Sequence, residues 1–400
     1  MSDLTKLAAD LRADAAGVNW PDAVDVRTRG DRRTTRRWIT TAAAAGAMIA
    51  LTGGVWQADG RRHAAPATAR VAVRLPLDAI EAAPSGTMFA ITHSCDADPC
   101  ATASAPRRYT VMRSTDLART WTTVGALDGI DGGIDVPLGL VVADDSTLWI
   151  VNGTKVLGSL DGGRWWSSWD LGADPTQSEG GGLAGRTLWL AHNGRVLVAT
   201  AGTRPEPTAS QPPGSGPITS LAVLSAGSAI ALRGQGTDVG WYRTDDRGAH
   251  WSAATDPCAG LSHPNVADAY LAAGRKGGLW AVCFVAGGHA PGWQLATSTD
   301  GGYSWQPHPG GAPGGDDVNP VSATIAWLTG SGAHVYRTTD AGANWTDVAH
   351  LPPGTSIQGG FVKDANTALY VLSEPGTGQV TLHLTTDGGT TWTTLPFGRW

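Results

Sequence analysis

The sequence predicts an all-β fold, a seven-bladed β-propeller that follows one N-terminal transmembrane helix. Three observations predict the propeller: a short motif occurs six times, its spacing leaves room for one further copy, and a separate series of apolar runs has seven members. The composition agrees with a turn-rich β-protein, because 54 of the 400 residues are glycine and only 16% are charged.

The recurring motif has the template Ser/Thr-x-Asp-x-Gly-x-x-Trp. Its aspartates are separated by 45, 85, 54, 40 and 47 residues, so one copy is missing from the long gap, where the sequence has only Thr200-Ala201-Gly202-Thr203. The six copies therefore indicate seven units. Their aspartates and tryptophans are Asp116, Asp161, Asp246, Asp300, Asp340, Asp387, Trp121, Trp166, Trp251, Trp305, Trp345 and Trp392.

A second series of short apolar runs precedes the motifs and includes the unit that has lost its motif. Residues 138–143, 148–151, 155–159 and 165–169 of the second unit read as four strands joined by turns. Four antiparallel strands in ~45 residues make one propeller blade. The seven apolar runs cover residues 87–91, 147–151, 187–191, 229–232, 279–283, 324–328 and 368–372.

Each motif residue has a structural role in this interpretation. The aspartate accepts backbone N–H groups of a hairpin turn, the Ser/Thr hydroxyl adds a local bond, and glycine supplies a positive φ. The tryptophan begins the fourth strand and covers the seam between blades, where burial removes up to ~250 Å² from water. Six motif tryptophans and four in the second strands account for ten of the eighteen tryptophans.

The motif resembles the Asp-box, or BNR, repeat of sialidases, sortilin-like receptors, xyloglucanases and photosystem-assembly-factor-like propellers. The resemblance covers residues ~71–400 and implies that the box is a peripheral turn on the face opposite the functional one. We expect the blades to end near residues 125, 170, 208, 254, 308, 350 and 400.

On the expected functional face lie the loops that join strands two and three of a blade and those that lead to the next blade. These loops are long and carry mostly acidic residues, which either are ordinary solvated charges or attract cationic groups, metal ions or polar polymers. The residues that we expect on this binding face are Asp128, Asp131, Asp135, His192, Arg195, Asp316 and Asp317.

A sialidase-like glycosidase is the alternative function that the resemblance implies. Arg74 lies in a Val-Arg-Leu-Pro sequence similar to the first arginine motif of sialidases. Asp96 or Asp98 follows as an acid/base candidate, and Tyr336 and Tyr370 are available late in the chain. The aromatic residue before the arginine is absent, however, and Arg113, Arg243 and Arg337 occupy repeat-equivalent positions that indicate structural roles. Seven units also differ from the six blades of sialidases.

The N-terminal residues indicate export. Residues 38–56 are apolar, uncharged and bounded by tryptophans, and nineteen helical residues span ~28 Å. An arginine-rich head at 1–37 predicts a cytoplasmic N-terminus, a signal-anchor helix, a linker at 57–70 and an extracytoplasmic propeller. The alternative is a secreted protein, because residues 35–39 resemble a twin-arginine signal and 67–69 offer an Ala-x-Ala cleavage site.

The charge and the cysteine content further limit the classes of function that fit this sequence. Residues 63–400 carry 19 Lys/Arg against 28 Asp/Glu, without the basic stripe of nucleic-acid-binding proteins. Four cysteines in an exported chain favour disulfides, for which we expect the pairs Cys95–Cys100 and Cys258–Cys283. No metal-ligand spacing and no cofactor motif occurs. We therefore expect a membrane-anchored, non-enzymatic module that binds a protein or glycan.

Overall fold

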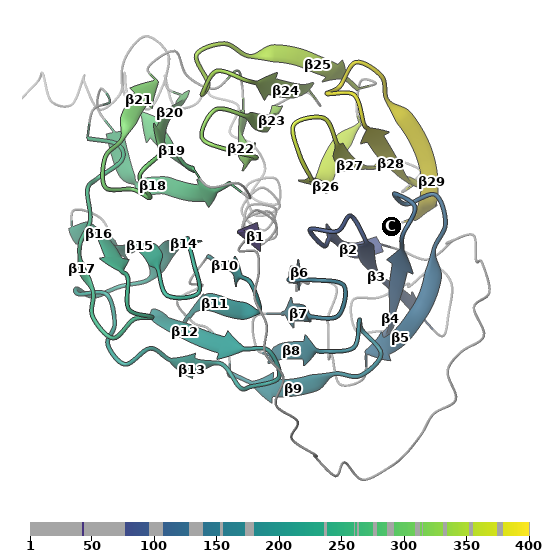
Figure 1. Cartoon of the computed structure of the whole chain (residues 1–400), viewed down its shortest axis with the longest axis horizontal. Helices are drawn as coiled ribbons and strands as arrows, with labels where there is room; N and C mark the ends of the chain where they lie inside the picture. Colours follow the sequence, from purple (N-terminus) through teal and green to yellow (C-terminus); the bar gives the residue numbers. More distant parts are fainter. Residues whose placement is uncertain are drawn as a thin grey trace, which may run out of the picture.

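Seven sheets, each with four antiparallel strands and one of them extended by a short parallel strand, surround one axis (Figure 1), which confirms the predicted seven-bladed propeller. Each blade consists of four strands that are consecutive in the sequence, the first nearest the axis and the fourth at the periphery. The computed structural model describes residues 42–43, 77–95, 107–127, 139–152, 155–172, 180–235, 238–259, 261, 264–274, 278–285, 292–308, 313, 315–330, 334–351, 355–373 and 379–399.

The blades follow one another in chain order. The first four have the strands β2 (Leu77–Ala82), β3 (Met88–Cys95), β4 (Arg107–Ser114), β5 (Thr122–Leu127); β6 (Gly139–Val142), β7 (Leu148–Val151), β8 (Lys155–Ser159), β9 (Ser167–Asp170); β10 (Gly181–Ala184), β11 (Thr187–His192), β12 (Arg195–Thr200), β13 (Glu206–Pro207); and β14 (Ile218–Val223), β15 (Ala229–Gln235), β16 (Asp238–Thr244), β17 (Ser252–Ala253). The last three have β18 (Pro264–Ala273), β19 (Leu279–Val285), β20 (Gly292–Ser298), β21 (Gln306–His308); β22 (Gly315–Pro320), β23 (Ala326–Gly330), β24 (His334–Thr338), β25 (Thr346–His350); and β26 (Ser356–Val362), β27 (Ala368–Ser373), β28 (Gln379–Thr385), β29 (Thr393–Arg399).

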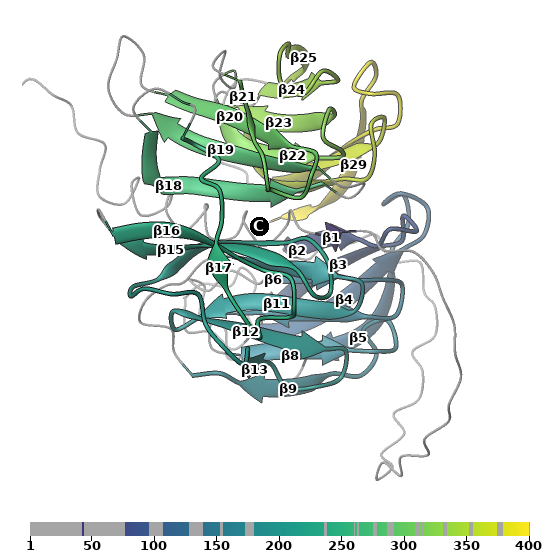
Figure 2. The ribbon, with the colours of Figure 1, turned by 60° about the vertical axis from the view of Figure 1, so that its left-hand side comes forward.

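Strand positions within the blades follow the sequence pattern closely. The second and third strands of blade 2 have the predicted bounds, and blade 3 is complete although its motif is missing. The fourth strands begin one residue after each motif tryptophan, not at it, because the turn continues through the tryptophan. Figure 2 shows the strands of blade 5, β18 to β21, side by side.

The N-terminal expectations lie outside the described residues, apart from one short strand. β1 (Ala42–Ala43), within the segment expected to span the membrane, pairs in parallel with β10. The head, the rest of the anchor and the linker are not described. Across the described ranges, no helix is long and apolar enough to cross a bilayer.

The six boxes share one hydrogen-bond pattern. In each, the Ser/Thr hydroxyl donates to the aspartate at 2.8–2.9 Å and accepts the N–H two residues after the aspartate at 2.8–3.0 Å. The aspartate also accepts the N–H four residues after it at 2.8–3.0 Å. The glycine slot has a positive φ, 88° at Gly342, although Ala118 fills it in blade 1 with φ 64°. These bonds satisfy the turn internally.

Apolar side chains fill the seam between each pair of neighbouring blades. The buried core divides into seven clusters, and a motif tryptophan packs at six of the seams. Only Trp121 among them is buried, whereas the other five are half-buried. The exception is the seam of blades 2 and 3, where the motif is missing and Trp149 and Trp169 pack instead. Four second-strand tryptophans are fully buried, namely Trp149, Trp189, Trp280 and Trp327.

Blades 7 and 1 close the ring through side chains. Every described strand of these two blades pairs within its own sheet, so no strand bridges them in the described ranges. Trp121 of blade 1 instead packs edge-on against Phe397 of blade 7, with ring centroids 5.3 Å apart, and both lie in one cluster with Leu77 and Phe361. Closure therefore depends on apolar packing at this seam.

We expect Trp121→Ala to lower the free energy of unfolding by ~3–5 kcal/mol, because it opens a cavity in the closing seam. Urea unfolding followed by circular dichroism measures the change. Trp165→Ala is the matched control, since Trp165 is 59% exposed and its loss should change stability by no more than ~0.5 kcal/mol. Equal losses in both variants would contradict this account of closure.

Candidate functional site

The candidate site is the upper face, defined here as the face that carries the connections from second to third strands and from one blade to the next. The boxes lie on the opposite face, which we call the box face. On the box face the aspartates are occupied by their own turns. These bonds lower the pKa of Asp300, Asp340 and Asp387, to about 2 for Asp387 through the Thr391 hydroxyl and N–H. Long connections lie only on the upper face, so ligand recognition is expected there.

Bulges distort the innermost strands where they start at the upper face. In blades 1, 4, 6 and 7 a single extra residue interrupts the pairing with the second strand. A larger irregularity occupies the same place in blade 5. A β-bulge redirects the side chains around it and is common beside functional sites. The four single bulged residues are Asp78, Thr219, Asp316 and Gln358.

A buried histidine and a half-buried aspartate form a pair at the bulge of blade 1. Nδ1 of His93 lies 2.8 and 2.9 Å from the two carboxylate oxygens of Asp78. Burial raises the pKa of Asp78, and the neighbouring His93 opposes that rise. Burial likewise raises the pKa of Tyr109, whose ring centroid lies 5.9 Å from that of His93, while Arg107 opposes that rise. No periodic pattern in the sequence marks this cluster.

A second polar group surrounds Asp317, which the sequence placed on the binding face. The Thr329 hydroxyl donates to Oδ2 of Asp317 at 3.0 Å. The side chain of Tyr370 from blade 7 is buried, and its hydroxyl has no hydrogen-bond partner among the described residues. Burial and then the charge of Asp317 raise the pKa of Tyr370. Asp317 is thus held within its own blade.

The other expected binding-face residues have separate locations. His192 is buried at the end of β11, where its Nε2 donates to the carbonyl of Leu171 at 3.1 Å, so it serves the blade 2–3 connection. Arg195 is exposed at the start of β12. Asp316 is described only as the bulged backbone position of β22. Asp128, Asp131 and Asp135 lie outside the described residues.

Four aromatic side chains form what we call the aromatic rim, at the upper end of the blade 5–6 seam. They are half-buried: Phe284, Trp293, His334 and Tyr336. Phe284 contacts Trp293 edge-on at 5.1 Å, and His334 stacks on Tyr336 at 5.7 Å with a 14° interplanar angle. Trp293 and Tyr336 pack on the same core cluster, and Asp347 fixes Nδ1 of His334 at 2.7 Å. The rim offers rigid, partly exposed aromatic surface.

The repeat-equivalent arginines bridge adjacent blades on the box face. Arg243 donates to the carbonyl of Gly301 in the next box and lies 4.1 Å from the ring centroid of Tyr303. Arg113 reaches Asp145 of blade 2 at 3.9 Å, and the Arg337 guanidinium lies beside Gly388 of blade 7. These three arginines are interblade contacts and form no clamp at the axis. Tyr336 belongs to the aromatic rim, while Arg74 and Asp96 lie outside the described residues.

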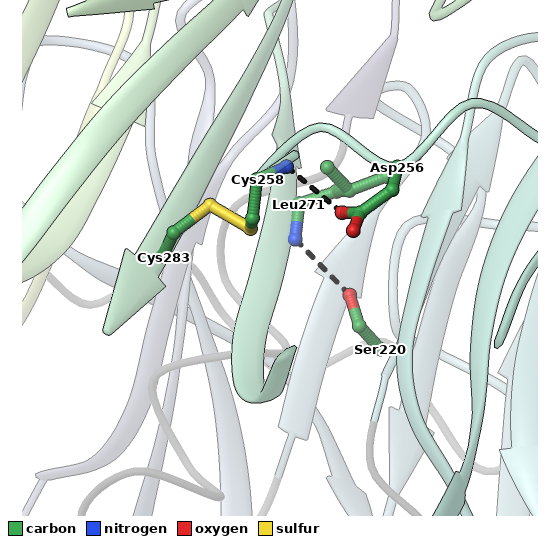
Figure 3. Close-up of a disulfide and its surroundings, with 5 residues drawn as sticks. All are labelled: Ser220, Asp256, Cys258, Leu271 and Cys283. Carbon is green, nitrogen blue, oxygen red and sulfur yellow. Dashed lines mark hydrogen bonds between the residues drawn. A yellow bond between two sulfur atoms is a disulfide. The ribbon is translucent and has the colours of Figure 1, made fainter. Parts of the chain in front are cut away.

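A disulfide joins the blade 4–5 connection to the second strand of blade 5 (Figure 3). It links Cys258 and Cys283, both fully buried, and the Cys258 N–H donates to Asp256 at 2.9 Å. Cys100 and the side chain of Cys95 lie outside the described residues. Across the described ranges, no group of three or more His, Cys, Asp or Glu side chains is placed to hold a metal ion.

We expect Tyr370→Phe to leave the free energy of unfolding unchanged or to raise it by up to ~2 kcal/mol, because it removes a buried hydroxyl without a partner. Tyr270→Phe is the control. Its hydroxyl accepts the Val318 N–H at 3.3 Å, so we expect a loss of ~0.5–1.5 kcal/mol. Urea unfolding measures both, and a loss above ~1 kcal/mol in Tyr370→Phe would show that its hydroxyl is bonded.

No family model and no curated protein sequence matches the chain. Among solved structures, it is similar to YCF48 bound to D1 peptide (19% identity, 64% of this chain and 80% of that one, TM-score 0.44). It is also similar to YCF48 from Cyanidioschyzon merolae (17% identity, 66% of this chain and 85% of that one, TM-score 0.46). A third similar structure is an ancestral GH74 enzyme (11% identity, 82% of this chain and 56% of that one, TM-score 0.45). With its box turns, the seven-bladed ring is consistent with the Asp-box propeller superfamily.

Proposed function

We propose that this chain is a non-enzymatic binding module that holds a protein or glycan ligand on its upper face. The aromatic rim carries the proposal. Amphipathic rings on a rigid scaffold give large contact area at low entropy cost, and such rings are enriched where proteins bind ligands. Here Trp293 and Tyr336 rest on the blade 5–6 core cluster, which holds them in place before a ligand arrives.

The polar groups of the upper face favour binding over hydrolysis. A retaining or inverting glycosidase needs two carboxyl groups that flank one bond. Three carboxylates of this face are instead engaged by partners in their own blades: Asp78 by His93, Asp317 by Thr329 and Asp347 by His334. They lie on blades 1 and 6, and each pair stabilises a strand end. These groups are suited to present a fixed polar surface.

We expect Trp293→Ala to reduce recovery of the ligand at least about tenfold, because truncating an aromatic hot-spot residue costs ~2 kcal/mol or more of binding. The measurement is quantitative co-purification of the full chain with its envelope neighbours from the native host. His250→Ser on the box face is the control, since Ser304 shows that serine can complete a box. Equal recovery by wild type and Trp293→Ala would contradict binding at the rim.

A sialidase assay separates the two functional classes. The full chain should not release 4-methylumbelliferone from its sialoside. Turnover that disappears in Arg74→Ala would overturn the non-enzymatic proposal in favour of the sialidase-like alternative.

The proposal includes a single-pass anchor at residues 38–56, in which Ala42 and Ala43 would belong to a helix instead of pairing with β10, with the propeller outside the cytoplasm. The apolar, uncharged composition of this segment and the six arginines between 27 and 37 support it. We expect protease added to intact cells to digest the propeller while the protein stays in the membrane fraction. Digestion only after lysis would contradict the orientation, and recovery in the medium would indicate a cleaved signal.

A further inference from the structure

The aromatic rim projects into one seam from both of its walls. Trp293 lies two residues before Leu295 on β20 and therefore on the same side of the sheet, where Leu295 belongs to the blade 5–6 core cluster. Phe284 is the register partner of Trp293 on β19. From blade 6, Tyr336 opposes Leu328, which is a member of the same cluster. Rings from both blades thus line the upper end of one seam.

A carboxylate that remains partly exposed stands beside the Tyr336 ring. Asp347 opposes Tyr336 in the register of β24 and β25, and it holds Nδ1 of His334, whose ring stacks on that of Tyr336. Burial and then the charge of Asp347 raise the pKa of Tyr336. The Asp347 side chain is 41% exposed, so it faces solvent as well as His334. An aromatic ring and a negative charge are therefore presented together.

The space around Tyr336 is kept open by glycine. A Cβ added to Gly330 would come within 2.7 Å of Cε2 of Tyr336, and Gly330 pairs with Gly315 on the first strand. The upper connections of these two blades, residues 286–291, 309–314 and 331–333, contain no Lys, Arg, Asp or Glu. The charge at this end of the seam is consequently set by the strands.

The two blades have an excess of negative charge at this end. Residues 264–351 contain six aspartates, no glutamate and three Lys or Arg, and all three cations belong to the box end. Arg337 lies 5.7 Å from the ring centroid of Trp327 and beside Gly388. Arg275 and Lys276 belong in the sequence to the connection from β18 to β19, which joins those strands at the box face. The strands and connections of blades 5 and 6 thus supply no Lys or Arg to the rim.

Blades 1 to 4 differ, because each has a cation at the upper end of its second or third strand. These residues are Arg107 and Arg108 in β4, Lys155 in β8, Arg195 in β12 and Arg233 in β15. The corresponding strand ends of blades 5 and 6 carry Phe284, Trp293 and His334 instead. The cationic and the aromatic parts of the upper face are therefore separate.

The box face shows what a tyrosine beside an aspartate can hold. The guanidinium of Arg243 lies 4.1 Å from the ring centroid of Tyr303 and donates to Asp245 at 2.7 Å. The Tyr303 hydroxyl donates to the same aspartate at 3.1 Å. At the rim the tyrosine and the aspartate are present, but blades 5 and 6 provide no arginine there. A cation from a partner would complete the arrangement.

We propose that the aromatic rim binds a basic segment of a partner protein, with an arginine side chain of that segment placed against Trp293 or Tyr336 and near Asp347. This inference rests on the proposed function and names the ligand class of the same site. Guanidinium groups are attracted to the faces of Trp and Tyr rings and make charge-assisted hydrogen bonds to carboxylates. An anionic glycan would meet uncompensated aspartates, and a neutral glycan would gain nothing from this charge. The charge distribution therefore favours the protein ligand over the glycan.

The test measures fluorescence anisotropy of labelled probe peptides on the full chain in detergent. The basic probe is Gly-Ser-Arg-Ala-Arg-Ser-Gly, and its matched neutral probe has citrulline, which is nearly isosteric with arginine, at both arginine positions. The basic probe should bind at least about fivefold more tightly than the citrulline probe, because only the guanidinium is charged. Its binding should weaken as salt rises.

Two variants locate the binding at the rim. Trp293→Ala and Asp347→Asn should each weaken the basic probe at least about fivefold, without a comparable effect on the citrulline probe in Asp347→Asn. Asparagine keeps an acceptor for His334, so the thermal midpoint of Asp347→Asn should stay within about 2 °C of wild type. Trp165→Ala, which removes an exposed tryptophan of the box face, is the matched control and should bind like wild type.

The inference is overturned if the arginine and citrulline probes bind equally, or if Trp293→Ala binds the basic probe like wild type. Displacement of the basic probe by cellohexaose would assign the rim to a glycan, and loss of self-association of Trp293→Ala in sedimentation would assign it to a second copy of this chain; either result overturns the inference. If Trp293→Ala loses the native ligand although the two probes bind equally, the basic occupant is refuted and the proposed function is not.

Discussion

Apolar packing across the seams between blades is the interaction on which the rest of this structure depends. Each sheet is twisted and has two faces that must be buried, and the neighbouring blade on each side covers one of them. The core clusters lie between sheets, with fully buried tryptophans such as Trp280 and Trp327 directed into the seam ahead. A blade therefore has no complete core of its own, and we expect the whole ring to fold and unfold cooperatively.

The box makes this packing compatible with a tight turn. Its Ser/Thr, aspartate and backbone N–H groups satisfy one another, so the turn needs no outside partner and the following tryptophan can enter the seam behind. Trp392 illustrates the result: its Nε1 donates to the carbonyl of Val348 in blade 6 at 2.9 Å while its ring contacts Trp327. Arg243 adds a polar bridge in the opposite direction, to the carbonyl of Gly301 in the next blade, and the Arg337 guanidinium lies beside Gly388 of blade 7. The box face is consequently mostly self-contained.

The repeat made most of the fold predictable, since spacing fixed the blade count and the apolar runs fixed the second strands, even in blade 3. The site was less predictable. Asp78 is the extra residue of a β-bulge. A bulge inserts one residue into a strand and leaves no recognisable sign in the hydrophobic pattern. The aromatic rim joins Trp293 and Tyr336, which are 43 positions apart in the sequence and meet only because blades 5 and 6 share a seam. The loop residues of the upper face follow no repeat, so composition alone suggested them.

Coupling across the closing seam is the most direct measure of this account. A double-mutant cycle on Trp121 and Phe397, which contact each other from blades 1 and 7, isolates it from the stability of either blade. Seam packing predicts a coupling energy of ~0.5–1.5 kcal/mol in urea unfolding, with a single cooperative transition in all four proteins. Additive effects within ~0.3 kcal/mol, or a separate early transition in wild type, would contradict closure by these side chains.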